Sequence, residues 1–337
     1  MAFNQIIQDL QSGTYHPVYF LQGSEFYLAR QFFKHLHQAI QAGDELDSLT
    51  LDFQEVGLQA VLDEANTFSF FSDRRLIIVE KADFVTSQAS SKLHKSDENA
   101  LITYLQEPNP ATVLVFVCKE DAVDKRRKIV KSLKKEACWV DVTPLDQSAV
   151  DRYVRQHLAQ EELQLGSGAI EELLDRVNYQ LTLAMGEMTK LHTFQHTGQE
   201  ITRQIIRQLV PRTLESDVFK LSNAVVSKQI DQAIQIYQDL ILMKHEPIAL
   251  HALLVSQFRI FIQVRIMMEQ GVHNQMIASH LGVHPYRVKL ANQNAQQMQL
   301  RELMTFYQEL VKVDFQMKTG IGHKESYFYI LLTMLKA

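Results

Sequence analysis

The chain has 337 residues, a formal net charge of −5 and a pI of about 6.2. Apolar residues make up 46 % and charged residues 22 %, which is typical of a globular protein of two or three domains and excludes a uniformly basic nucleic-acid coat protein. With only 12 glycines and 7 prolines, we expect the chain to be mainly helical.

The N-terminal residues Met1, Ala2 and Phe3 begin a segment without the charged and apolar sections of a signal peptide. We also expect no apolar run long enough to span a bilayer. Cys118 and Cys138 lie in apolar, strand-like runs without metal-ligand spacing, so we interpret them as buried residues in a reducing compartment. Together these features predict a cytoplasmic protein.

The first part of the chain alternates strand and helix patterns. Its short runs of β-branched and aromatic residues are bounded by polar or turn residues, and segments of helical spacing separate them. Such alternation predicts a mainly parallel sheet with helices on both faces. The polar stretch 86–99 is expected to be a loop or a frayed helix start. The predicted strands are 18–21, 48–53, 75–80, 112–118 and 138–142, and the predicted helices are 25–41, 57–66, 100–106 and 125–135.

After Thr143 and Pro144 only helical patterns remain, and Pro211 marks a junction between shorter and longer ones. The pattern therefore predicts an α/β domain, a small helical domain and a larger helical bundle, with boundaries 1–142, 143–211 and 212–337. The predicted helices are 146–160, 168–177, 180–193, 202–210, 216–227, 229–244, 247–270, 274–281, 285–296, 300–317 and 326–335.

The first strand is followed by Gly23 and then by a helical segment, which is the layout of a phosphate-binding loop, G-x-x-x-x-G-K-[ST]. Counting from Gly23, the second glycine, lysine and hydroxyl positions hold Leu28, Ala29 and Arg30. Glu25 adds a negative charge where a polyphosphate would lie. Two interpretations stay open: a nucleotide-type architecture that has lost its chemistry, or an ordinary strand, glycine and helix unit.

No catalytic, cofactor-binding or metal-binding residues stand out from the sequence. His192 and His196 have the spacing of two ligands on one helix, but no third ligand is evident, so a surface pair is expected. No nucleophile–base arrangement, G-x-S-x-G elbow or isolated carboxylate pair is recognisable. We therefore expect no intrinsic catalysis and no cofactor.

Five stretches, in the same order over nearly the whole chain, resemble the delta-subunit family of the bacterial DNA polymerase III clamp loader. The resemblance lies in their order and spacing together rather than in any single motif. It implies an AAA+-type α/β domain at 1–142, a helical lid domain at 143–211 and a C-terminal helical collar at 212–337. The five stretches are 17–23, 70–76, 101–116, 124–128 and 281–289.

The resemblance implies a component of the DNA polymerase III holoenzyme, a DNA-directed DNA polymerase, that does not hydrolyse ATP itself. Such a subunit binds the sliding clamp (beta) and opens its ring for loading onto primed DNA. It contacts gamma/tau and delta-prime type subunits through its C-terminal domain. The apolar strand that ends in Glu80 and Lys81 agrees, because an active ATPase has Asp-Glu there to position Mg²⁺ and water. Two other functions stay open: an active AAA+ ATPase with an atypical loop, and a helix-turn-helix regulator of DNA.

Phe68, Phe70 and Phe71 cannot all share one face of a helix or a strand, so at least one ring is expected to be exposed. Exposed aromatic side chains are common anchors in protein interfaces. The resemblance implies that Phe70 and Phe71, next to Phe68, enter a hydrophobic pocket on the clamp. The alternative is a local core cluster with these rings packed inside the subunit itself.

The segment 125–135 holds seven cations, while Ile129, Val130 and Leu133 form an apolar stripe. A helix with one buried and one strongly positive side is predicted. Its charged side either contacts DNA phosphates or is a solvated face that docks on an acidic neighbour. The candidate DNA contacts are Lys125, Arg126, Arg127, Lys128 and Lys131.

The segment 275–289 resembles a helix-turn-helix, with Ala278 in its first helix, Gly282 at the turn and a basic second helix. Long apolar stripes in the surrounding helices fit a packed bundle instead. We interpret the segment as a packing motif of the collar, with DNA reading as the alternative.

Overall fold

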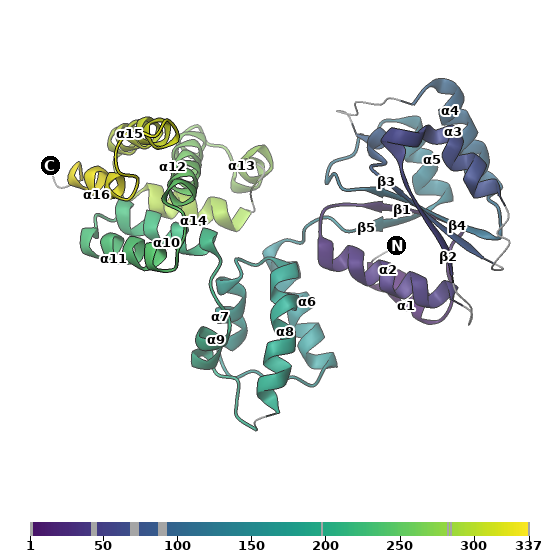
Figure 1. Cartoon of the computed structure of the whole chain (residues 1–337), viewed down its shortest axis with the longest axis horizontal. Coiled ribbons are helices and arrows are strands. Elements are labelled where there is room, and N and C mark those ends of the chain that lie inside the picture. The colour runs from purple at the N-terminus through teal and green to yellow at the C-terminus, as the bar shows by residue number, and fades with distance from the viewer. Residues whose placement is uncertain are drawn as a thin grey trace. The chain divides into compact units, whose positions relative to one another are not determined.

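The computed structural model describes residues 3–41, 46–67, 74–86, 93–196, 198–281, 283 and 285–335 (Figure 1). The chain divides into two compact units, residues 1–145 and 146–337. The second unit contains both predicted helical domains, so the boundary at residue 211 stays a prediction.

The first unit is built on a five-stranded parallel sheet with the strand order β2-β3-β4-β1-β5. The central strand β4 is buried along its whole length, as expected for a strand with helices over both faces. In register, Val18 pairs with Leu114 and Tyr19 with Cys138. The strands are β1 (Val18–Gln22), β2 (Asp47–Asp52), β3 (Arg75–Glu80), β4 (Thr112–Cys118) and β5 (Cys138–Asp141).

The helices of this unit cover both faces of the sheet. The connection from β1 to β2 runs to the far edge, whereas the later connections return across the sheet, so right-handed crossovers place their helices on opposite faces. Figure 1 shows α1 and α2 on one face and α3, α4 and α5 on the other. These helices are α1 (Phe3–Gln11), α2 (Phe26–Ile40), α3 (Phe53–Asn66), α4 (Lys95–Gln106) and α5 (Lys128–Glu136), and a 3-10 turn, η1, spans Asp83–Val85.

This architecture confirms the predicted fold class in its layout, a parallel α/β domain followed by helices. Cys118 and Cys138 are free and buried, as predicted, and burial raises the pKa of the two thiols to about 12 and about 11. The helix α1 was not predicted. The basic helix was predicted to begin at Lys125 but begins at Lys128, because Arg127 has an extended backbone and stands before the first helical residue.

The second unit is helical in its described residues. The shorter helices come first in the sequence, as predicted, and the longer ones follow Pro211. The first group is α6 (Gln147–Gln160), α7 (Ala169–Arg176), α8 (Leu181–Gln195) and α9 (Arg203–Leu209). The second is α10 (Leu214–Val226), α11 (Ile230–Leu242), α12 (Pro247–Glu269), α13 (Asn274–Leu281), α14 (Pro285–Ala295), α15 (Leu300–Lys318) and α16 (Ser326–Thr333).

The helix α12 is the core of this second group. Its side chains Phe258, Phe261 and Val264 are fully buried in a cluster that also takes residues from α10, α14 and α15. By length and composition α12 could cross a membrane, because an 18-residue stretch of it has a mean hydropathy of 1.4; no such run was expected from the sequence. Within the protein, 44 % of that stretch is buried, and core helices of globular domains can be as long and as apolar.

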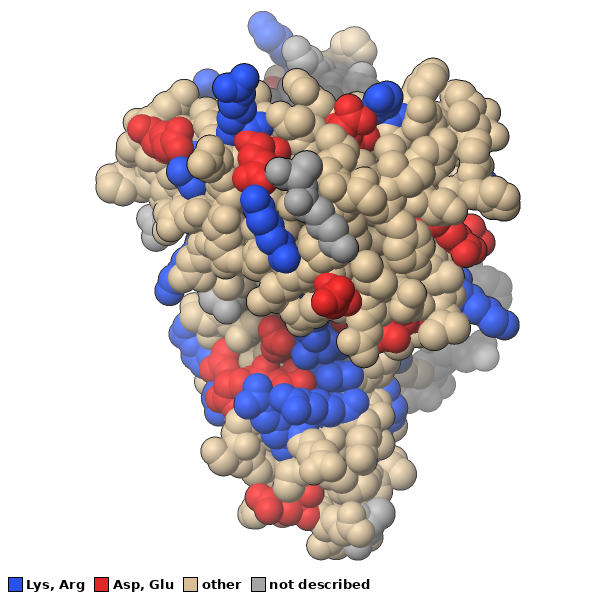
Figure 2. Space-filling view, turned by 90° about the vertical axis from the view of Figure 1, so that its left-hand side faces the viewer, with Lys and Arg blue, Asp and Glu red and all other residues tan. Residues whose placement is uncertain are grey.

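Four arginines of the second unit surround one buried carboxylate, that of Glu172 on α7. The side chain of Glu172 is only 2 % exposed, and Arg203 and Arg207 of α9 contact it at 2.9 and 3.2 Å. Arg176 and Arg212 contact it at 3.3 and 3.6 Å. Burial alone would raise the pKa of Glu172, but hydrogen bonds from the arginines lower it to about 2. Figure 2 shows charged side chains of both signs gathered over the helices of the first group.

His251 of α12 makes the stability of the helical unit depend on pH. Its side chain is buried, and its Nε2 atom lies 2.7 Å from the carbonyl oxygen of Leu310. Burial lowers the pKa of His251 below the ordinary 6.5. The unfolded chain therefore binds the proton more readily, so the contribution of His251 to stability is fully present above about pH 6.5 and is lost as the pH falls toward the folded-state pKa.

We predict that His251→Gln, which keeps a donor for Leu310, weakens this acid sensitivity. The wild type should lose at most about 1.4 kcal/mol per pH unit from this group below about pH 6.5. The measurement is denaturant unfolding followed by far-UV circular dichroism at several pH values. His323→Gln is the control because that side chain is exposed. An unchanged pH profile in His251→Gln would contradict the assignment.

Gly23 follows the last residue of β1 and lies against Val142 and Thr143, the residues that follow β5. A Cβ atom at this position would be 2.3 Å from the backbone nitrogen of Thr143 and 2.3 Å from the backbone carbon of Val142. Its φ of +125° is also a conformation that side-chain-bearing residues rarely adopt. Because the obstructing atoms belong to the backbone, no rotamer change can make room for a methyl group.

We predict that Gly23→Ala lowers the free energy of unfolding of the first unit by about 2–4 kcal/mol through overpacking and backbone strain. Gly13→Ala is the matched control, since Gly13 has a φ of +80° and no described atom within 4 Å of the added methyl. That change should cost about 1–2 kcal/mol. Urea unfolding can be followed by the fluorescence of Trp139, the single tryptophan of the chain. Equal losses in both variants would show that the close approach is unimportant.

Candidate functional site

The turn between β1 and α2 has the position of a phosphate-binding loop, but its backbone N–H groups already donate hydrogen bonds to acceptors of the same chain. The N–H of Gly23 donates to the carbonyl of Cys118 and that of Glu25 donates to the carbonyl of Val142, both at 2.9 Å. The N–H of Ser24 donates to the carboxylate of Asp121 at 2.9 Å, and its hydroxyl donates to the other oxygen at 3.1 Å. A phosphate would have to displace these acceptors.

The first turn of α2 also supplies its own negative charge. The side chain of Glu25 accepts the N–H of Tyr27 at 3.2 Å and caps the helix. A carboxylate stabilises the positive end of a helix in the way that a bound phosphate does. Asp121 accepts the N–H of Ser24, so two carboxylates of the chain lie at the N-terminus of α2, where a bound anion would otherwise lie.

The groups that hold a nucleotide are missing in space as well as in sequence. Because α2 begins at Phe26, the expected glycine, lysine and hydroxyl positions fall inside the helix. Leu28 is buried among apolar residues, and Ala29 and Arg30 follow it. The strand–glycine–helix layout is therefore confirmed, but the loop between them is too short for a phosphate cradle.

At the end of β3, Glu80 and Lys81 are each paired with a residue of opposite charge. The ammonium of Lys81 hydrogen-bonds to Asp52 at the end of β2 and lowers the pKa of that carboxyl. Glu80 forms an ion pair of 3.9 Å with Lys119. Among the described residues, no group of three or more His, Cys, Asp or Glu side chains could hold a metal ion. His192 lies 3.9 Å from Glu161.

The predicted clamp-binding residues Phe68, Phe70 and Phe71 lie outside the described residues. The residues on either side are described. Thr67 ends α3, and the Arg74 guanidinium lies 5.0 Å from the ring centre of Tyr15. Arg75, the first residue of β3, forms ion pairs with Asp47 and Glu64. Thr67 and Arg75, described residues on either side, therefore lie at the edge where the strands begin, opposite the turn that holds Gly23.

In the basic segment 125–135, one cation has a structural role and others are exposed. Ile129, Val130 and Leu133 are fully buried, which confirms the predicted apolar stripe. Arg127 turns inward and donates to the carbonyls of Phe84 and Thr86, so its guanidinium holds the η1 turn.

The other candidate DNA contacts stay exposed. Arg126 pairs with Asp124, and Lys128 lies 3.4 Å from the side-chain oxygen of Asn99. Lys125 and Lys131 are exposed. Contact with DNA stays a prediction for these residues.

The helix-turn-helix-like segment contributes buried residues to the core of α12. Ile277, Val288 and Ala291 are fully buried, and Ala278 is nearly so. The guanidinium of Arg287 donates to the side-chain oxygen of Gln257 at 3.3 Å, and burial lowers its pKa. Gly282 lies outside the described residues. Arg287 is half-buried and bonded within the protein, and its neighbours fill the core, so this geometry favours the packing interpretation.

Sequence reasoning missed Asp121 and an open cavity beside it. Asp121 is 97 residues from Ser24, and nothing in its neighbourhood marks it as a partner of the turn. The cavity brings together Lys125, Lys134 and Trp139, which are spread over two elements and a loop. The only signal in the sequence is the presence of a tryptophan close to a run of cations.

Comparisons with known proteins cover both units. The family model of the DNA polymerase III delta subunit matches residues 19–143, and the model of that subunit's C-terminal domain matches residues 215–335. The DNA polymerase III subunit delta of Bacillus subtilis (strain 168) is 33 % identical over 337 residues, with 99 % of this chain and 97 % of the relative covered.

Solved structures are also similar. The Bacillus subtilis DNA clamp loader delta protein superposes with a TM-score of 0.79 at 33 % identity, over 99 % of this chain and 100 % of that one. Domain III of the Thermotoga maritima replication initiation protein DnaA matches with a TM-score of 0.32 at 14 % identity, over 62 % of this chain and 90 % of that one. The chain therefore belongs to the family of DNA polymerase III delta subunits, the delta subunits of the clamp loader.

Proposed function

We propose that this delta subunit binds the sliding clamp and opens its ring for loading onto primed DNA, without hydrolysing ATP itself. One observation carries the second half of the proposal: the N–H groups of the β1–α2 turn already donate to acceptors of the chain. A nucleotide would have to break these hydrogen bonds and displace the carboxylate of Asp121. The alternative of an active ATPase with an atypical loop lacks a place for the phosphates.

We predict that the chain does not bind ATP with Mg²⁺ in isothermal titration calorimetry and does not hydrolyse it. Ala29→Lys is the matched variant because it returns an ammonium to the expected lysine position. This variant should not bind either, since the added lysine leaves the N–H groups of Ser24 and Glu25 occupied. Binding near one nucleotide per native chain would favour the active-ATPase alternative.

Clamp binding is assigned to Phe70 and Phe71, with Phe68 beside them, on the family resemblance and on the position of their segment. The described residues on either side of it, at the end of α3 and the start of β3, lie at the edge of the sheet opposite the closed turn. The ion pairs of Arg75 fix one of its ends. Burying two phenylalanine rings in a partner supplies roughly 3–6 kcal/mol before ordering costs. An open clamp is favoured only if it offers these rings better contacts than the closed ring does.

We predict that the double variant Phe70→Ala with Phe71→Ala loses at least about 100-fold in affinity for the cognate clamp, about 2.7 kcal/mol. The measurement is surface plasmon resonance without nucleotide. Phe26→Ala is the control, because Phe26 is a 65 % exposed phenylalanine of the same unit.

Unfolding of the same double variant separates the two interpretations of these rings. A clamp-binding pair leaves the free energy of unfolding nearly unchanged. A local core cluster would instead lower it by about 3–5 kcal/mol per ring and leave clamp binding intact in the folded fraction. Retained affinity would therefore refute the assignment.

The C-terminal helices are proposed to contact the gamma/tau and delta-prime type subunits of the loader. Their surface carries apolar side chains that are costly to leave in water, among them Leu242 at 78 %, Phe315 at 65 % and Ile330 at 56 % exposure. Figure 2 shows a largely uncharged face over these helices. Primed DNA is the proposed substrate of the whole complex, and the cytoplasm its compartment.

A further inference from the structure

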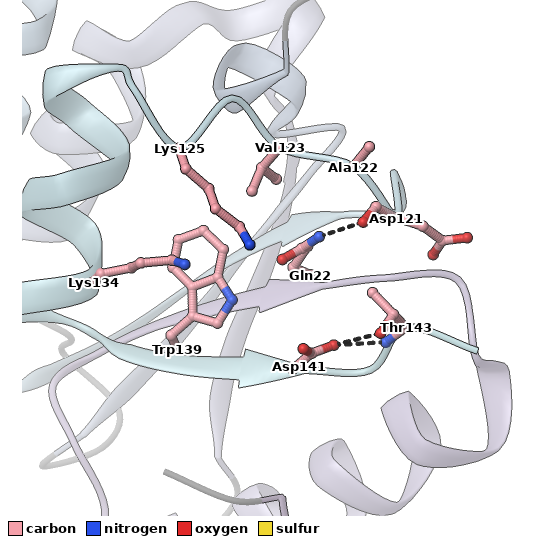
Figure 3. Close-up of a pocket in the computed structure, with 9 residues that line it drawn as sticks. All are labelled: Gln22, Asp121, Ala122, Val123, Lys125, Lys134, Trp139, Asp141 and Thr143. Atoms are coloured by element: carbon pink, nitrogen blue, oxygen red, sulfur yellow. Dashed lines mark hydrogen bonds between the residues drawn. The ribbon is translucent and has the colours of Figure 1, made fainter. Parts of the chain in front are cut away.

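An open cavity of about 660 Å³ lies at the carboxyl edge of the sheet, between the ends of β1 and β5 and the segment that leads into α5 (Figure 3). Ligands of parallel α/β folds bind at this edge, where the strand order reverses around β1. The volume is within the range of about 300–1,000 Å³ that small-molecule sites have. It is larger than a single phosphate group needs.

Two lysines give the cavity unpaired positive charge. The side chains of Lys125 and Lys134 both extend over it, and their ammonium groups lie near the indole of Trp139 (Figure 3). Neither lysine forms an ion pair with a carboxylate among the residues that the structure describes. Lys135, the next residue along α5, differs because it is paired with Glu136 at 2.7 Å.

The two carboxylates of the cavity wall are already engaged in local hydrogen bonds. Asp121 accepts the N–H and hydroxyl of Ser24 and points away from the cavity (Figure 3). Asp141 accepts the N–H and hydroxyl of Thr143 at 3.0 and 2.8 Å. The ammonium groups of Lys125 and Lys134, which have no such local partner in the described part of the chain, are the groups of the cavity best placed to meet an anionic ligand.

Trp139 adds an aromatic surface to this cationic site. One face of its indole stacks on Phe20 with ring centres 4.6 Å apart. The ammonium of Lys134 lies over the same indole, 4.9 Å from its ring centre. A lysine side chain is flexible and can move from the ring to a phosphate, which would expose the indole to a planar group. Cations beside an aromatic face are the usual elements of single-stranded nucleic acid sites.

We infer that this cavity binds one unpaired nucleotide of single-stranded DNA, with Lys125 and Lys134 on phosphate oxygens and the base against the indole of Trp139. The inference rests on the proposed role in loading clamps onto primed DNA, whose template strand is single-stranded beyond the primer. It places the DNA contact at the cavity rather than along the whole basic segment.

Other anions fit the site less well. The lysines alone would accept the backbone of a duplex, but paired bases cannot reach an indole inside a cavity. A free nucleoside triphosphate with Mg²⁺ needs the N–H groups of the β1–α2 turn or a metal site for its phosphates, and these N–H groups are occupied. A single strand needs only the two ammonium groups and the ring.

The test uses the full chain and the fluorescence of Trp139, which reports on this cavity alone because it is the only tryptophan. An oligo-dT strand should change the fluorescence in a saturable way. A duplex of the same length and ATP with Mg²⁺ should each leave it unchanged at equal phosphate concentration. An equal response to the duplex would overturn the single-strand inference, and a response to ATP alone would overturn both this inference and the closed turn.

Variants separate the cavity from the general charge of α5. Anisotropy of a labelled oligo-dT strand should show a loss of about tenfold or more in Lys125→Ala with Lys134→Ala. Two lost phosphate contacts should also reduce the salt slope of the binding constant by about 1.4, at about 0.7 per contact. Lys135→Ala is the control and should keep affinity and slope. Equal weakening by Lys135→Ala, or full binding by the double variant, would overturn the inference.

The same variants distinguish this inference from the proposed function. The described residues that flank the proposed clamp-binding segment lie at the opposite edge of the sheet, so the double lysine variant should bind the clamp with unchanged affinity. Loss of DNA binding with retained clamp binding supports both proposals. Native clamp binding together with no fluorescence response to oligo-dT would refute the cavity and leave the clamp-binding role standing.

Discussion

The contact between Gly23 and the backbone of Val142 and Thr143 is the constraint around which the first unit is built. It brings the end of β5 against the start of α2, where the carbonyl of Val142 accepts the N–H of Glu25. Asp121 also holds this turn in place, because its carboxylate accepts the N–H of Ser24. The same three segments form the wall of the cavity beside Trp139. A fold of nucleotide-binding type is thus held together at the point where a nucleotide would otherwise lie.

The carboxyl edge of the sheet carries the closed turn and the cationic cavity, whereas Thr67 and Arg75, described residues on either side of the segment with Phe70 and Phe71, lie at the amino edge. In the second unit, α12 packs its apolar side chains inward while other helices keep apolar groups such as Phe315 at the surface. Surface of that kind suits a subunit that works only as part of an assembly.

The centre of the sheet could be predicted because β1 and β4 are nearly continuous apolar runs, which a strand covered on both faces buries throughout. The absence of the lysine and the hydroxyl of a phosphate-binding loop could also be predicted, because their positions follow from the spacing after Gly23. The role of Asp121 was not predictable, because its partner lies 97 residues away. The charge run at 125–135 did not show that Arg127 turns inward, because charge alone carries no direction. Helix α1 is short and no N-capping side chain precedes it in the sequence; its one signal is Gly13, whose positive φ ends the helix.

The carboxylate of Asp121 has a thermodynamic consequence for the cell. A protein that is stabilised by a bound nucleotide becomes more or less stable as the concentration of that nucleotide changes. Asp121 is part of the polypeptide, so the anion at this helix is present at fixed stoichiometry and cannot dissociate. The first unit should therefore melt at the same temperature in well-fed and energy-starved cells.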